Sequence, residues 1–301
     1  AIGREPDLRV EGRHLGLTPP DEAGARDETI ARIRRAVANG VDLDRIVRLA
    51  AAAPALAVSP IAGTPAARPD VVIAVARDSA FGFYYPDDLA ALERAGARLV
   101  FFNAFEDARL PEADGLFIGG GFPETQADRL AANKALRNDV AARLRAGLPA
   151  YAECGGLMYL TRSIAFGGSV HPMVGFVPAD TVMWETPQGR GLVVLEETSD
   201  APWPQIAGGG ETRFPAHEFH YASLERLDPG ARFAYRVVRG HGVNGRQDGI
   251  VQNNLLAGFT HLRDTSRNRW AGRFVEFVRR TRARRASGRT VEPARAVSRH
   301  A

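Results

Sequence analysis

The sequence contains one cysteine, Cys154, among 301 residues. A single cysteine cannot form an internal disulfide, and it cannot supply a cysteine-cluster metal site. Two roles remain for this side chain: an inert thiol in the core, which is the commoner role of a lone cysteine, or a nucleophile. The residues around Cys154 must decide between them.

Lysine is equally scarce, because Lys134 is the only one in the chain. A phosphate-binding loop requires a glycine-rich turn followed by a lysine and by a hydroxyl that holds Mg²⁺. No Gly-Lys-Ser/Thr sequence occurs, and the glycine triplet at residues 119–121 is followed by Phe-Pro-Glu. We therefore predict that no segment of this sequence binds the phosphates of ATP.

Long apolar runs are also absent. No stretch approaches the roughly 20 residues that are needed to span a bilayer, and residues 1–5 do not resemble a signal peptide. Hydrophobic residues make up 45% of the chain and charged residues 25%, as is usual for globular proteins. We expect a cytoplasmic enzyme with no membrane partner.

Positive charge is concentrated at one end. Residues 263–301 contain 12 arginines and three acidic residues, so the rest of the chain is mildly acidic although the net charge is +4. Neither a recognition motif nor interleaved aromatic residues accompany the arginines, which argues against a nucleic-acid partner. A solvated, disordered basic tail is the interpretation that we favour for residues 281–301.

Residues 1–56 show two helical patterns. Apolar residues recur at helical spacing over residues 27–38 and over residues 43–52. Residues 57–69 are rich in proline and small residues and show no periodicity, which predicts a linker between this short part and the rest of the chain.

From residue 70 onward, apolar runs alternate with helical sequence. We expect strands at residues 71–76, 99–102, 115–118 and 147–153, and helices at residues 86–95 and 124–146. This alternation predicts an α/β fold with a doubly wound parallel sheet. After residue 164 the pattern becomes shorter and β-rich, and a closing helix is expected over residues 268–280.

Cys154 lies between a predicted strand and the glycine pair Gly155–Gly156, where the next helix begins. A sharp turn at this point would project the thiol, and glycines behind the turn allow the backbone to pass closely. The positive end of the helix would also stabilise a thiolate. This context favours the nucleophile over the inert thiol.

A glycine triplet ends the neighbouring predicted strand. Backbone N–H groups in such a turn can point inward, and we expect those of Gly120 and Gly121, together with that of Gly155, to form an oxyanion hole. Glycine-rich turns after strands are common, so this signal would be weak without Cys154.

The segments that carry these features resemble one family. Residues 73–81, 83–86, 119–124 and 151–160 are closely similar to the cobyrinic (hydrogenobyrinic) acid a,c-diamide synthases, and the similarity extends over about residues 2–280. The nucleophile turn is less similar to that of the sister family, cobyric acid synthase. Residues 13–17 resemble a segment near the end of the family's ATP-binding half.

The resemblance implies a domain organisation. Residues 70–280 would form a class I glutamine amidotransferase domain, a flavodoxin-like doubly wound sheet with an added β-rich C-terminal part. Residues 1–56 would be the C-terminal remnant of an ATP-binding synthetase domain. The chain is therefore expected to hold only the tail of that half.

The resemblance also implies a base. The family has a histidine near its C-terminal end, and His261 in Gly-Phe-Thr-His-Leu matches that position. It would accept the thiol proton and later give one to the departing ammonia. Many class I amidotransferases have a glutamate two residues after this histidine, but Arg263 stands there in this chain. We therefore leave the third catalytic member unassigned.

A His-x-x-His sequence, His217 and His220, suggests a metal site at first sight. Residues three apart on a strand point to opposite faces, so joint ligation of a metal is not expected. The resemblance implies a different place for this segment, in the wall of the glutamine site or facing the partner half.

The implied reaction is amidation of the a and c side-chain carboxylates of cobyrinic or hydrogenobyrinic acid, with glutamine as nitrogen donor. ATP and Mg²⁺ would act through the N-terminal half. Two alternatives stay open: the amidotransferase of a sister synthetase such as cobyric acid synthase, and a non-catalytic subunit that docks a synthetase. The sequence leaves the oligomeric state open, a homodimer included.

Overall fold

The structure is a computed structural model that describes residues 2–3, 8, 26–55, 68–208 and 210–287. The chain divides into two compact units, Ala1–Thr64 and Pro65–Ala301, which are described separately. Residues 13–17, most of the predicted linker and the end of the basic tail lie outside the described residues.

The first unit contains the two predicted helices, α1 (Arg26–Gly40) and α2 (Leu43–Ala51). Asp42 begins α2 as an N-cap, since its carboxylate accepts a hydrogen bond from the Arg45 N–H at 2.8 Å. No residue of α2 is buried. Large apolar side chains of both helices are exposed: Ile30, Ile33, Leu43, Ile46, Val47 and Leu49.

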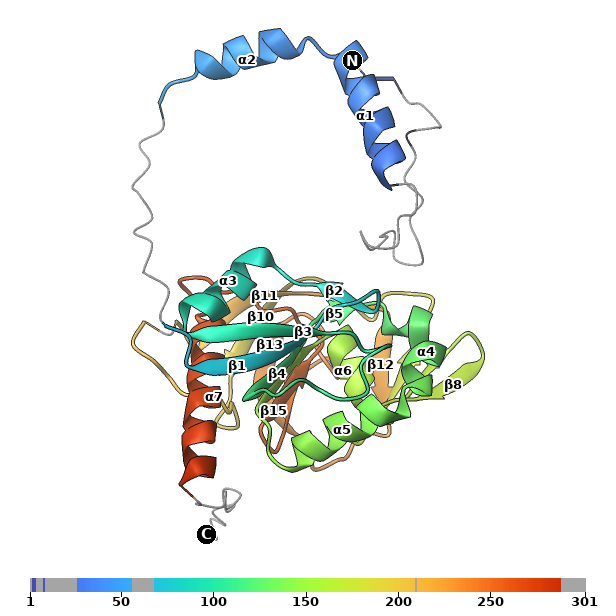
Figure 1. Cartoon of the computed structure of the whole chain (residues 1–301), viewed down its shortest axis with the longest axis vertical. Coiled ribbons are helices and arrows are strands. Elements are labelled where there is room, and N and C mark those ends of the chain that lie inside the picture. The colour runs from blue at the N-terminus through green and yellow to red at the C-terminus, as the bar shows by residue number, and fades with distance from the viewer. Residues whose placement is uncertain (1, 4–7, 9–25, 56–67, 209, 288–301) are drawn as a thin grey trace. The chain divides into compact units, whose positions relative to one another are not determined.

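The second unit is built on a nine-stranded sheet with the strand order β11-β10-β13-β14-β15-β6-β4-β1-β3 (Figure 1). In chain order these strands are β1 (Val71–Ala76), β3 (Ala97–Phe102), β4 (Gly115–Ile118), β6 (Ala150–Glu153), β10 (Gly189–Glu197), β11 (Arg213–His220), β13 (Arg232–Arg239), β14 (Gln247–Gln252) and β15 (Leu255–Gly258). The five strands from β15 to β3 are parallel, and the others join in antiparallel fashion. The predicted α/β fold with a β-rich addition is thus confirmed, and the addition extends the same sheet.

The remaining strands form two smaller sheets. One has the order β12-β9-β7-β8 and consists of β7 (Ser163–Phe166), β8 (Ser169–Pro172), β9 (Asp180–Met183) and β12 (Ala222–Glu225). The other pairs β2 (Phe81–Phe83) with β5 (Gly120–Gly121). The second pairing holds the glycine turn against Phe81 and Phe83.

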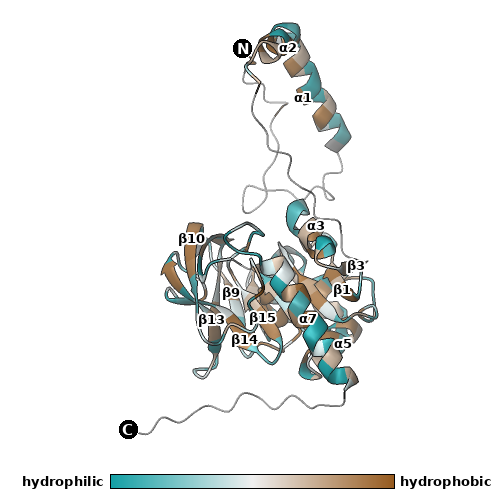
Figure 2. Cartoon of the chain, turned by 90° about the vertical axis from the view of Figure 1, so that its left-hand side faces the viewer, coloured by the Kyte–Doolittle hydropathy of each residue, from teal (hydrophilic) through white to brown (hydrophobic). Residues whose placement is uncertain are grey.

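Helices cover both faces of the parallel strands. α3 (Pro86–Arg94) and α7 (Trp270–Ala286) share one apolar cluster with Phe117 and Tyr151. α5 (Lys134–Arg145) and α6 (Gly155–Leu160) share the other with Ile118 and Ala152. Neighbouring strand residues therefore enter opposite clusters, as the two-residue period of a strand requires. In Figure 2 the polar residues of α7 mark its outer side.

The structure corrects three predicted boundaries. Residues 124–146 form three short elements, η3 (Pro123–Gln126), α4 (Ala127–Ala132) and α5, because Asn133 ends one helix and caps the next through a hydrogen bond from the Leu136 N–H. β6 begins at Ala150, since Gly147 has a φ of +83°. α7 continues to Ala286, so residues 281–286 are helical and do not belong to a disordered tail.

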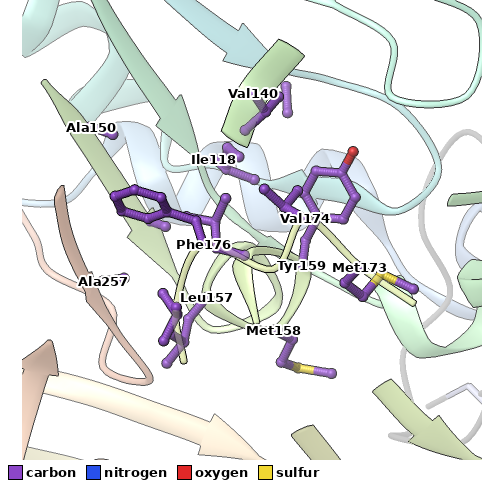
Figure 3. Packing of buried hydrophobic residues seen from close by; sticks show 14 of the residues in the cluster. Ile118, Val140, Ala150, Leu157, Met158, Tyr159, Met173, Val174, Phe176 and Ala257 are labelled. Atoms are coloured by element: carbon purple, nitrogen blue, oxygen red, sulfur yellow. The ribbon is translucent and has the colours of Figure 1, made fainter. Parts of the chain in front are cut away.

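The short helix α6 is buried along its whole length. Leu157, Met158 and Tyr159 lie among Ile118, Val140, Val174 and Phe176 (Figure 3). Burying one large apolar side chain stabilises a fold by about 1.5–3 kcal/mol. Packing of this kind fixes α6, and with it the residue that precedes it. No helix in the described ranges combines the length and apolarity that crossing a bilayer requires.

Candidate active site

Cys154 forms the sharp turn that the sequence predicts. Its backbone lies at φ 46° and ψ −103°, and it connects β6 to α6. The Cys154 N–H donates to the Gly258 carbonyl at 2.8 Å, and its own carbonyl accepts from Met158 at 3.0 Å. A Cβ at Gly156 would lie 2.2 Å from the Ile118 carbonyl oxygen. Only glycine therefore fits behind the turn.

Three parallel strands bring the predicted site residues together. Cys154 follows β6, His261 lies just beyond β15, and the glycine turn follows β4. β6 pairs with both β4 and β15, so the carboxyl ends of all three strands lie side by side. The residues singled out in the sequence are thus neighbours in space.

His261 is buried, and it lies at the carboxyl end of the strand that pairs with the one before Cys154. Its Nδ1 atom is 3.3 Å from Oε2 of Glu153. Burial by itself would lower the pKa of His261, but the contacts with Cys154 and Glu153 outweigh it and raise that pKa well above its usual value. The site therefore favours the imidazolium form of His261.

Strand β11 forms another wall of the site. The thiol of Cys154 is 3.9 Å from the carbonyl oxygen of Phe219. The backbones of His217 and His261 exchange hydrogen bonds of 2.7 and 3.2 Å, and their rings are 5.6 Å apart. Burial, and secondarily the charge of His261, lower the pKa of His217.

The two histidines of the His-x-x-His sequence point in opposite directions. His217 faces His261, whereas the ring of His220 stacks on Phe259 at 4.1 Å. The Nδ1 atom of His220 is 2.8 Å from the Ala222 carbonyl oxygen. This arrangement follows the strand alternation on which the prediction was based.

The glycine turn lies directly against Cys154 and His261. A Cβ at Gly120 would be 2.7 Å from Cε1 of His261, and a Cβ at Gly155 would be 3.1 Å from the Gly121 nitrogen. The Gly119 N–H is already occupied, because it donates to the Tyr84 hydroxyl at 3.0 Å. The turn thus places backbone atoms close to Cys154 and His261, and side chains at Gly120 and Gly155 would not fit there.

Arg263 is directed to α3. Its guanidinium lies 3.9 Å from the ring centroid of Tyr85 and forms ion pairs with Asp88 at 3.5 Å and with Asp87 at 3.6 Å. Burial raises the pKa of Asp88 to about 6. The residue two positions after His261 therefore stabilises the contact with α3.

Sequence reasoning missed Glu153, although this residue directly precedes Cys154 in the chain. Strand alternation would send its side chain away from that of Cys154. One signal was present: a carboxylate at the end of an apolar, buried strand must find a partner inside the fold.

The described residues do not fit an ATP–Mg²⁺ site. The glycine turn leads into η3 without a lysine, and Lys134 is the first residue of α5. Within the described ranges, no group of three or more His, Cys, Asp or Glu side chains is arranged to hold a metal ion.

Residues 72–269 match the family model of the CobB/CobQ-like glutamine amidotransferase domain. The chain belongs to this family. The match confirms the resemblance seen around Cys154 and in the glycine turn.

Two curated relatives carry the same name. A cobyrinate a,c-diamide synthase of Magnetococcus marinus is 38% identical over 289 residues, which cover 93% of this chain and 60% of the relative. The enzyme of the same name from Archaeoglobus fulgidus is 41% identical over 270 residues, which cover 89% of this chain and 58% of the relative. The chain thus spans about 60% of the length of these relatives.

A solved structure, "Structure of PurLQS from Thermotoga maritima", aligns with a TM-score of 0.52. The alignment covers 71% of this chain and 99% of the matched chain at 15% identity. At this identity the likeness shows the fold alone.

Proposed function

We propose that this chain is the glutamine-hydrolysing part of a cobyrinate a,c-diamide synthase. The observation that carries the proposal is that Cys154, at a turn with positive φ, and the buried His261 lie at the adjacent carboxyl ends of β6 and β15, beside a glycine-lined wall. A non-catalytic docking subunit would not need this strained backbone or a buried histidine with a raised pKa.

The reaction begins at the thiolate of Cys154. It attacks the carboxamide carbon of glutamine, and the resulting oxyanion accepts hydrogen bonds from the N–H groups of Gly120, Gly121 and Gly155. As the C–N bond breaks, the His261 imidazolium gives its proton to the nitrogen, and ammonia leaves. The product of this half-reaction is a glutamyl thioester.

Water then completes the cycle. The neutral His261 accepts a proton from water, which attacks the thioester carbon. The C–S bond breaks, glutamate departs, and the thiolate–imidazolium pair is restored. His261 thus serves as acid in the first half and as base in the second.

The shared name of the relatives supports cobyrinic acid, or its metal-free counterpart hydrogenobyrinic acid, as the acceptor of the ammonia. Amidation of a carboxylate requires its activation, and we assign ATP and Mg²⁺ to the part of the relatives that this chain does not cover. The site geometry would also suit a sister synthetase such as cobyric acid synthase, but the relatives favour the a,c-diamide.

The proposal is tested with a diazoketone analogue of glutamine. The purified chain should hydrolyse glutamine slowly, and the analogue should label Cys154 and no other residue. A folded chain that neither hydrolyses millimolar glutamine nor becomes labelled would contradict the proposal. Incubation with ATP–Mg²⁺, glutamine and cobyrinic acid should yield glutamate without diamide. Diamide formation would show that an ATP site exists in this chain.

A further inference from the structure

Glu153 is a buried carboxylate with three partners around the catalytic histidine. It is the last residue of β6. Its Oε1 atom accepts hydrogen bonds from the Leu262 N–H, at 2.9 Å, and from the Tyr151 hydroxyl. Its Oε2 atom faces Nδ1 of His261 at 3.3 Å. Two of these partners fix the carboxylate, and the third is the candidate base.

The turn at Cys154 explains how adjacent residues reach one imidazole. Tyr151 and Glu153 lie two apart on β6, so they point to the same face of the sheet. On a regular strand, the next side chain would point to the other face. The positive φ of Cys154 breaks this alternation, so that the Cys154 side chain need not point away from the imidazole with which Glu153 forms a hydrogen bond.

The position two residues after His261 offers no alternative carboxylate. Arg263 stands there, and its guanidinium is held by Tyr85, Asp87 and Asp88. A cation cannot accept the N–H of an imidazole. Of the acidic side chains in the described ranges, Glu153 is the one that forms a hydrogen bond with His261.

We propose that Glu153 is the positioning residue of His261, and that it takes over the role of the orienting glutamate which many class I amidotransferases have two residues after the histidine. This inference rests on the proposed glutaminase function. By accepting the Nδ1–H, Glu153 sets the tautomer in which Nε2 faces the Cys154 thiol. Its charge stabilises the imidazolium that forms when the thiol loses its proton.

Tyr151 has a supporting role in this arrangement. Its ring lies in the aromatic cluster of Phe117, Trp203, Trp270 and Phe274, which prevents the hydroxyl from moving away. The hydroxyl and the Leu262 N–H hold Oε1, so Oε2 remains directed at His261. The 3.3 Å separation is expected to shorten when the imidazolium forms.

The first test is Glu153→Gln, with Glu197→Gln as the matched control. Glu197 is also buried and paired, with Arg273, but it does not contact the site. Glu153→Gln should lower kcat for glutamine hydrolysis by about 100- to 10,000-fold and change KM by only a few-fold, since the amide can fix the wrong tautomer. Glu153→Asp keeps the charge on a shorter side chain and should retain more activity than Glu153→Gln.

The pH dependence distinguishes a role of Glu153 in positioning His261 from a role in the stability of the fold alone. Loss of the carboxylate disfavours the thiolate–imidazolium pair, so the acidic limb of cysteine alkylation should move to higher pH by about 1–3 units. The basic limb of glutamine hydrolysis should move to lower pH, because His261 loses its proton more easily. The pH range between the acidic and the basic limb therefore becomes narrower in Glu153→Gln, whereas in Glu197→Gln it should keep the width of the wild type. Equal widths in the two variants would overturn the inference.

An NMR titration of His261 gives a readout that does not need activity. In a Cys154→Ala background, the ¹⁵N shifts of His261 should report an Nδ1–H tautomer, and Glu153→Gln should lower the pKa of His261 by about 1–3 units. Tyr151→Phe offers a milder variant, with a smaller decrease, if Glu153→Gln does not fold. An unchanged titration in both would refute the role of Glu153, whereas absent labelling of wild-type Cys154 would refute the glutaminase proposal alone.

Discussion

Helices α2 and α6 are both short, yet they differ in what holds them. α2 has an N-cap and an apolar stripe, but none of its nine residues is buried. α6 has six residues and no side-chain cap, and all six are buried. Isolated helices of these lengths are marginal in water, so tertiary packing decides how firmly each is placed.

The comparison explains where a reactive residue can be positioned. The core around α6 holds the start of the helix, and Cys154 keeps a backbone conformation that a non-glycine residue rarely adopts. Nothing in the described part of the chain covers the apolar side chains of α2 to a comparable degree. Packing thus makes the difference between a helix that presents a nucleophile and one that has only local order.

The largest effect is expected for Cys154→Ser at the buried end of α6. A hydroxyl in the same place is a far poorer nucleophile than a thiolate, so glutamine hydrolysis should become undetectable. Circular dichroism should show an unchanged fold, because the two side chains are similar in size. Residual glutaminase activity in the Ser variant would mean that α6 does not present the nucleophile.

The next largest effect is expected for substitution of the buried His261, compared with substitution of the more exposed Arg263. His261→Ala should slow thioester formation by about two to four orders of magnitude, which is the usual contribution of acid–base catalysis. Arg263→Ala should have a much smaller effect, since its partners lie on or beside α3. Pre-steady-state measurement of thioester formation checks both. Equal losses would give Arg263 a direct role.

The smallest expected effects are on the free energy of unfolding, and they allow α6 and α2 to be compared directly. Leu157→Ala in α6 should reduce the free energy of unfolding by about 2–5 kcal/mol, because it leaves a cavity in the core. Leu49→Ala in α2, where the side chain is 64% exposed, should change it by less than about 0.5 kcal/mol. Urea unfolding measures both values. A large loss from Leu49→Ala would show that α2 packs against something in solution.

Several features could be predicted because they depend on neighbours in sequence. The apolar runs before Cys154 and after residue 70 predicted buried parallel strands, and β6 and β1 are such strands. Gly156 predicted a close backbone approach, and the Ile118 carbonyl indeed lies behind it. The pairing of His261 with Cys154 came from the family resemblance, since the two residues are far apart in the chain.

Other features depended on contacts that sequence patterns do not encode. Asn133 ended a helix that periodicity alone would continue, because its side-chain amide donates to the carbonyls of Ala104 and Asp107 in a distant loop. Residues 281–286 were predicted to belong to a basic tail, but Arg282 donates a hydrogen bond to the carbonyl of Asp70, just before β1. Local pattern could not reveal either partner.

The sequence by itself determined the α/β alternation, the turn at Cys154 and the glycines around it, since each depends on local backbone freedom and hydrophobic period. Only the tertiary structure decided that the β-rich segment continues the central sheet, that Arg263 turns toward α3, and that Glu153 meets His261. The physical reason is the same in each case. Strand pairing and side-chain partners far apart in the chain are selected by the burial of whole faces and by the need to pair buried charges, and no short segment contains that information.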